Sequence, residues 1–85
     1  MMQQLDNVQR LLELIDAAAE SSKMQRMVFI ENARVVASEL NKKEWAQIVK
    51  LSKGLNAIQF NMLITSGIKK PYRAAIFKGR LERFE

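Results

Sequence analysis

Helix-start signals recur three times along this chain, and they constrain its fold more than any other feature of the sequence. Ser22, Asn41 and Asn56 are each followed three positions later by Gln or Glu. In such a capping box the first side chain accepts a hydrogen bond from an amide at the start of a helix, and the Gln or Glu reaches back to the capping residue. Three such signals in 85 residues predict a chain of helices joined by short connections.

The first segment of the chain carries a helical repeat of apolar residues. They recur at alternating steps of three and four, which predicts an amphipathic helix of about four turns. The members of this stripe are Leu5, Val8, Leu12, Ile15 and Ala19, widened by Leu11 and Ala18. The stripe can pack inside a bundle or against the same helix of a second copy, because both contacts bury the same face. We expect packing within the monomer, with a homodimer through this first helix as the alternative.

The second helix is expected to run from Ser22 to Leu40. Its apolar residues fall on two sides, which predicts packing against two neighbours. The main face comprises Phe29, Ala33, Val36 and Leu40, and a thinner stripe comprises Met24, Val28 and Val35. A strand over Met27–Ile30 is the less favoured alternative, because no turn residues flank that segment.

Two further helices are bounded by asparagine and glycine. Asn41 starts a third helix, which Gly54 is expected to stop in a left-handed conformation. Trp45 in this helix is interpreted as a core anchor in preference to a platform for base stacking. Asn56 starts a fourth helix that ends at Gly67. Apolar residues surround most of the circumference of the fourth helix, so we expect it to be buried.

A last helix begins near Pro71, whose missing amide costs nothing in a first turn. Lys70 before it is biased toward an extended backbone. An apolar stripe on the helical wheel is expected to hold this helix to the bundle, and an adjoining stripe of arginines is expected to face outward. The apolar stripe is Ala74, Phe77, Leu81 and Phe84, and the basic stripe is Arg73, Arg80 and Arg83.

The expected fold is therefore all-α, with one domain over residues 1–85 and a bundle of four to five helices. The fourth helix, the turn at Gly67 and the basic last helix have the outline of a helix-turn-helix in the C-terminal half, in which the second helix enters the major groove of DNA. Gly79 departs from that pattern, since a glycine inside a reading helix costs about 1 kcal/mol relative to alanine.

The absence of cysteine and histidine excludes most catalytic and metal-binding chemistry. No disulfide, thiolate or imidazole metal ligand, Ser-His pair or Cys-His pair can form. We therefore predict no enzymatic activity, no metal and no cofactor. The longest apolar run is Met27–Ile30, far short of the ~20 residues that cross a bilayer, and the N-terminus lacks the pattern of a signal peptide. These features predict a cytoplasmic protein with no membrane partner.

Charge is divided unevenly between the two halves of the chain. Residues 1–41 carry four Lys or Arg and six Asp or Glu, a net of −2, whereas residues 42–85 carry ten and three, a net of +7. Self-repulsion of this kind destabilises a compact fold unless the charge has a use. The asymmetry therefore indicates a polyanion or an acidic partner for the C-terminal half.

The start of the last helix is the strongest candidate site. Lys69 and Lys70 lie where the helix macrodipole is positive, and no Ser, Thr, Asp or Asn caps the helix. Free amides there, the two lysines and the Tyr72 hydroxyl would form a phosphate cradle. The candidate binding residues are Lys69, Lys70, Tyr72, Arg73, Arg80 and Arg83, with Lys43 and Lys50 of the third helix on flanking phosphates.

These observations predict a small non-enzymatic DNA-binding regulator of bacterial or phage type, which binds nucleic acid, duplex DNA above all, through its basic C-terminal helix. The alternative is a protein-binding modulator or inhibitor of phage or mobile-element type. It would dock the same helix on an acidic surface of a larger machine, such as RNA polymerase or a nucleic-acid-guided nuclease, with Ile76, Phe77 or Phe84 as apolar anchors. No motif of the chain identifies a protein family.

Overall fold

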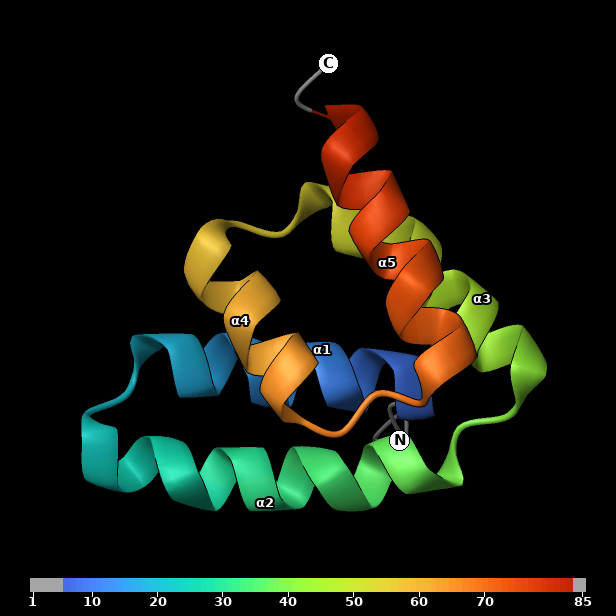
Figure 1. The fold of residues 1–85 in the computed structure, drawn as a ribbon. Helices are drawn as coiled ribbons and strands as arrows, with labels where there is room; N and C mark the ends of the chain where they lie inside the picture. The colour runs from blue at the N-terminus through green and yellow to red at the C-terminus, as the bar shows by residue number, and fades with distance from the viewer. Residues whose placement is uncertain (1–5, 84–85) are drawn as a thin grey trace, which may run out of the picture.

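A computed structural model describes the backbone of residues 6–83 and the side chains of residues 6–79 (Figure 1). The elements are α1 (Asn7–Glu20), α2 (Lys23–Glu39), α3 (Lys42–Leu51), the 3₁₀ turn η1 (Ser52–Gly54), α4 (Ala57–Thr65) and α5 (Lys70–Arg83). Residues 6–83 contain no strand, so the predicted all-α bundle is confirmed and the strand alternative inside α2 is wrong.

The three predicted helix starts are observed. Asn41 with Glu44 and Asn56 with Gln59 form complete capping boxes, with N···O distances of 2.8 to 3.0 Å. Ser22 makes one of the two capping bonds, since its hydroxyl accepts from an amide of the first turn of α2 at 3.4 Å. Capping satisfies amides that have no partner inside the helix, so each start is fixed by residues within one turn of it.

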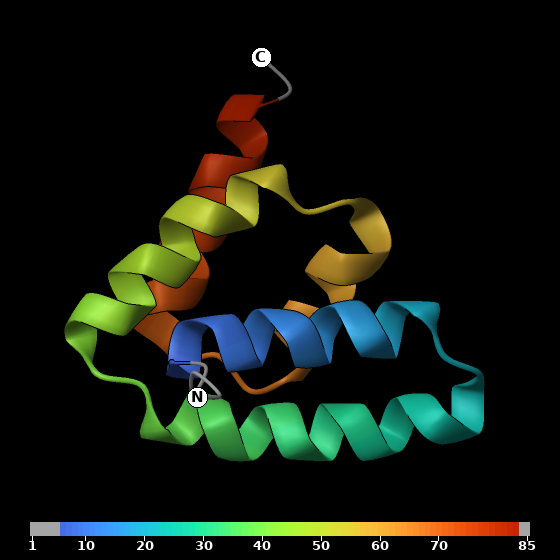
Figure 2. The same ribbon diagram turned by 180° about the vertical axis from the view of Figure 1, so that it is seen from behind.

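Helix α1 packs inside the monomer, as expected for its apolar stripe. It contacts α2 on one side and α4 on another, and both views show it at the centre of these elements (Figures 1 and 2). Its buried side chains are Val8, Leu11, Ile15 and Ala18. Leu12 and Ala19 lie at the margin, so the buried face is turned slightly from the predicted one, and Leu5 falls outside the described residues.

Helices α2 and α4 are less covered than their sequences predict. Met24, Val28 and Val35 of α2 are 85%, 61% and 59% exposed, so the prediction that α2 packs on two neighbours is wrong. The expectation of a buried α4 is also wrong, because Leu63 is its one buried side chain among those described and Ile58 is 52% exposed. Both helices use one face on α1, and apolar residues away from that face, such as Val28 and Ile58, stay exposed.

The ends of the later helices agree in part with the predictions. Gly67 ends α4 with φ of +86°, the left-handed conformation that glycine allows. Gly54 does not have a positive φ, and α3 instead tightens into η1, where the Ser52 hydroxyl donates to the Val49 carbonyl at 2.7 Å. Lys70 is the first residue of α5 and is helical, contrary to the extended backbone expected before proline.

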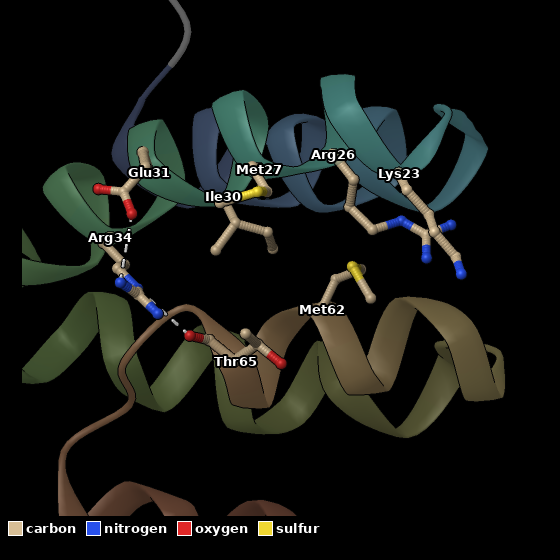
Figure 3. Close-up of a pocket in the computed structure, with 8 residues that line it drawn as sticks. All are labelled: Lys23, Arg26, Met27, Ile30, Glu31, Arg34, Met62 and Thr65. Carbon is tan, nitrogen blue, oxygen red and sulfur yellow. Dashed lines mark hydrogen bonds and ion pairs between the residues drawn. The ribbon is translucent and has the colours of Figure 1, made fainter.

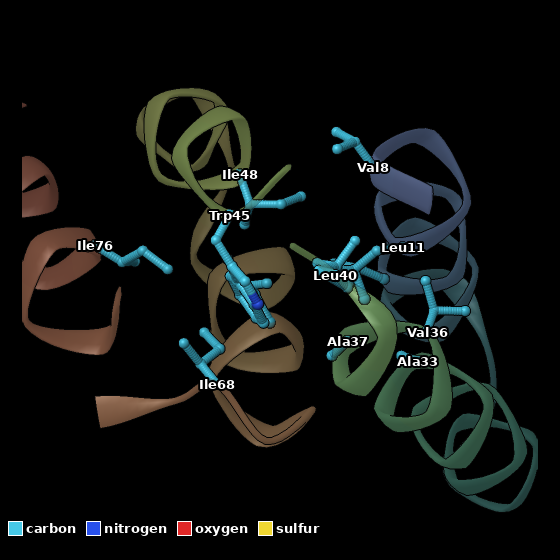
Figure 4. Close-up of a cluster of buried hydrophobic side chains, with 12 residues drawn as sticks. Val8, Leu11, Ala33, Val36, Ala37, Leu40, Trp45, Ile48, Ile68 and Ile76 are labelled. Atoms are coloured by element: carbon cyan, nitrogen blue, oxygen red, sulfur yellow. The ribbon is translucent and has the colours of Figure 1, made fainter. Parts of the chain in front are cut away.

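One hydrophobic cluster joins the helices, and Trp45 lies within it at 1% exposure (Figure 4). Ile68 from the connector and Ile76 from α5 approach the cluster from the other side of the indole. The interpretation of Trp45 as a core anchor is therefore confirmed. None of the helices within residues 6–83 has both the length and the apolar character that a bilayer-spanning helix needs.

Candidate nucleic-acid interface

Helices α3 and α5 lie side by side and run in the same direction. Near their starts, the rings of Trp45 and Tyr72 stack with centroids 5.1 Å apart and planes 8° from parallel. Near the end of α3, the side chain of Lys53 crosses the backbone of Gly79, where an added Cβ would lie 3.0 Å from the lysine Cε. The contact points advance together along both helices, so the two N-termini meet at one end of the molecule (Figure 1).

The face of α5 that packs differs from the predicted one. Tyr72, Ile76 and Gly79, spaced by four and three residues, turn toward α3 and η1. Ala74 and Phe77 were expected to hold the helix, but Ala74 is exposed and Phe77, 43% exposed, contacts only the edge of the bundle through Phe60 of α4 among the described residues. The other two members of that stripe, Leu81 and Phe84, lie outside the described side chains. Gly79 thus lies in the contact between α5 and η1, with the Lys53 side chain directly over its backbone.

Five exposed cations gather at the shared N-terminal end of α3 and α5. We call them the basic end: Lys42, Lys43, Lys69, Lys70 and Arg73. Within the described part of the chain, none of the five lies within 4.0 Å of a carboxylate. The nearby carboxylate of Glu44 is already used in the capping box of α3. Two macrodipoles add their positive ends to these charges, so the basic end is a concentrated positive surface.

The first turn of α5 offers fewer amides than the predicted phosphate cradle requires. The carbonyl of Lys69 accepts hydrogen bonds from the amides of Tyr72, at 3.1 Å, and Arg73, at 3.0 Å. Pro71 has no amide hydrogen to donate. Of residues 70–73, only Lys70 keeps an amide without an acceptor among the described residues. The anion-binding capacity of this end therefore comes chiefly from side-chain charge.

The remaining predicted site residues are placed as follows. Tyr72 is half-buried and its ring is part of the packing between α3 and α5. Lys43 and Lys50, seven residues apart, share the exposed side of α3. Arg80 and Arg83 belong to the backbone of α5, and their side chains lie outside the described residues. Lys42, the first residue of α3 and an exposed neighbour of Lys43, also belongs to this end, because the starts of α3 and α5 meet there.

Neither similarity to known proteins nor a group of metal-binding side chains suggests a different role for this surface. No protein-family model, curated protein or solved structure matches this chain. The residues that the structure describes contain no group of three or more acidic side chains placed to hold a metal ion.

Proposed function

We propose that this protein is a small non-enzymatic regulator of bacterial or phage type that binds duplex DNA through the basic end. The observation that carries the proposal is the meeting of two helix N-termini with five exposed cations that have no carboxylate partner among the described side chains. Lysine at the positive end of a macrodipole costs about 0.3 to 1 kcal/mol per charge, and a phosphate placed there reverses the sign of that contribution. The arrangement is unfavourable for the free protein and favourable for a complex with a polyanion.

The course of the chain around this end is compatible with a helix-turn-helix. Helix α4 is followed by a connector of residues 66–69 and then by α5. Phe60 of α4 meets Phe77 of α5 edge to face, with ring centroids 5.4 Å apart. Arg73 and Ala74 lie on the exposed side of the first turns of α5, where a reading helix carries its base contacts. Under this proposal Lys43 and Lys50 contact flanking phosphates.

Salt dependence tests the proposal most directly. Binding of a fluorescent duplex of about 20 base pairs is measured by anisotropy at several salt concentrations. If the five cations of the basic end neutralise phosphates, the slope of log K against log salt is about −4.5, and affinity falls about 500-fold between ~50 and ~200 mM salt. The folded protein failing to bind at ~50 mM salt would exclude a nucleic-acid function.

A protein partner is the second candidate, favoured by Phe77, which is 43% exposed one helical turn after the exposed Arg73. Ile76, the first of the predicted anchors, is fully buried and is not available to a partner, and Phe84 lies outside the described residues. An acidic protein surface would thus use Phe77 as its apolar anchor. The Phe77→Ala variant distinguishes the two candidates. It should leave the salt slope of DNA binding unchanged, but it should weaken the affinity for a protein partner.

A further inference from the structure

A groove of about 290 Å³ separates α2 from α4 (Figure 3). Both helices pack on α1, and the space between them is left open on the outer side. Ile30 from α2 and Met62 from α4 form apolar walls that point toward each other, and Met27 stands at the mouth with 70% of its surface exposed. The lining is therefore largely apolar and accessible.

Basic side chains lie at both ends of this groove. Arg34 closes one end, because its Nε donates to the Thr65 carbonyl at 3.4 Å and its guanidinium pairs with Glu31 at 3.3 Å. Lys23 and Arg26 lie at the other end (Figure 3). Arg26 is fixed there by donating to carbonyls at the end of α1, the shortest bond being 2.9 Å. Three cations and one carboxylate give the groove a net positive charge.

The apolar surface continues out of the groove along α2. Met24 and Val28, one helical turn apart, are exposed beside Met27, and Val35 extends the same side by two turns. This exposed apolar strip is longer than the contact surface of a small ligand. The volume of the groove is also at the lower limit of the ~300 to 1,000 Å³ typical of small-molecule pockets. The groove and the strip together have the shape that an amphipathic helix needs, because such a helix can insert one or two side chains into the groove and place others along α2.

Charge indicates which helix would fit. A second copy is unfavourable, because each molecule carries +5 and its own α2 presents the same three cations. A helix with acidic residues beside its apolar anchors would instead face Lys23 and Arg34 with opposite charge. The Lys23 end of α2 and the basic end lie on opposite sides of the molecule in both views, so a helix docked at the Lys23 end of the groove leaves the basic end free (Figures 1 and 2).

We propose that the groove between α2 and α4 is a docking site for an amphipathic helix of a protein partner, with apolar anchors at i, i+4 and i+7 flanked by Asp or Glu. The inference is independent of DNA binding. It makes the protein a two-sided adaptor, in which one end can hold a polyanion while the groove holds an acidic helix.

A pair of designed peptides tests this site on the intact protein. The first is a fluorescent helix of about 15 residues with Leu at i, i+4 and i+7 and Glu beside them; the second replaces every Glu by Lys. Anisotropy should show that the acidic peptide binds at least ~tenfold more tightly than the basic one. Met27→Glu, at an exposed position, should weaken its binding at least ~tenfold. Gln47→Glu introduces the same charge at an exposed position of α3, away from the groove and from the apolar strip of α2, and is the matched control.

Each outcome of these binding experiments either supports the docking site or overturns it. Equal binding of both peptides, no binding of either, or equal effects of Met27→Glu and Gln47→Glu would overturn the proposal. Sedimentation velocity of the protein alone provides a further arm, since a dimer that Met27→Glu dissociates would assign the groove to a second copy. Lys69→Asp should leave peptide binding unchanged, so a failure of DNA binding and a failure of this site are read separately.

Discussion

Replacing Lys69 by aspartate should stabilise the free protein and weaken its binding to DNA. Lys69 is the capping position of α5, because its carbonyl accepts the amides of Tyr72 and Arg73. A carboxylate at position 69 can accept from the Tyr72 amide, whereas Pro71 offers none. An effective cap contributes about 0.5 to 2 kcal/mol, and reversing the charge at the macrodipole adds a few tenths.

We therefore expect Lys69→Asp to raise the free energy of unfolding by about 1 kcal/mol. The Tyr72 amide already donates to the carbonyl of residue 69, so the new carboxylate would share that donor. We therefore expect a stabilisation in the lower half of the range for capping. For a domain of this size, about 1 kcal/mol corresponds to a rise in Tm of about 4 to 8 °C, which thermal unfolding followed by circular dichroism will resolve.

DNA affinity should change in the opposite direction. The substitution removes one cation from the basic end and places a negative charge in its centre, so we expect about tenfold weaker binding, or about 1.4 kcal/mol, at ~50 mM salt. The salt slope should become less steep by about one unit. The control is the double variant Gln25→Glu and Asn32→Glu, which changes net charge by the same amount on α2 and should bind as the parent does.

A Lys69→Asp variant that melts at a lower temperature and binds DNA as tightly as the parent would refute this reasoning. Lys69 would then support the fold, and the DNA interface would have to lie elsewhere. If the variant and the control weakened binding equally, net charge and not the basic end would govern affinity.

Three further substitutions test the fold. Leu63→Ala empties a fully buried site and should cost about 2 to 5 kcal/mol by chemical denaturation, and a cost under ~1 kcal/mol would contradict the core assignment. Gly67→Ala should destabilise by more than ~1 kcal/mol, because φ of +86° disfavours any side chain although nothing blocks the space; a neutral effect would contradict that backbone. Asn41→Ala should cost about 1 kcal/mol through loss of a capping box, measurable as a lower Tm, whereas an unchanged Tm would show the box to be dispensable.

Local signals in the sequence are enough to predict where α2, α3 and α4 begin. Ser22, Asn41 and Asn56 act on amides within one turn, so the information needed is local and can be read without knowing the tertiary packing. The left-handed end of α4 at Gly67 is local in the same sense. The prediction of a left-handed Gly54 failed, because α3 ends by tightening into the 3₁₀ turn η1, which needs no positive φ.

Which faces are covered and which charges meet depends on how the helices pack against one another. In α5 the side with Tyr72 and Ile76 is the one that packs on α3, whereas Phe77 on the predicted side stays 43% exposed. In α2 the second apolar stripe, of Met24, Val28 and Val35, is left exposed by the described part of the chain. The basic end joins Lys42 and Lys69, which no local pattern connects, through the stacking of two rings between parallel helices. Faces and charges are selected by contacts between segments distant in sequence, and those contacts exist only once the chain has folded.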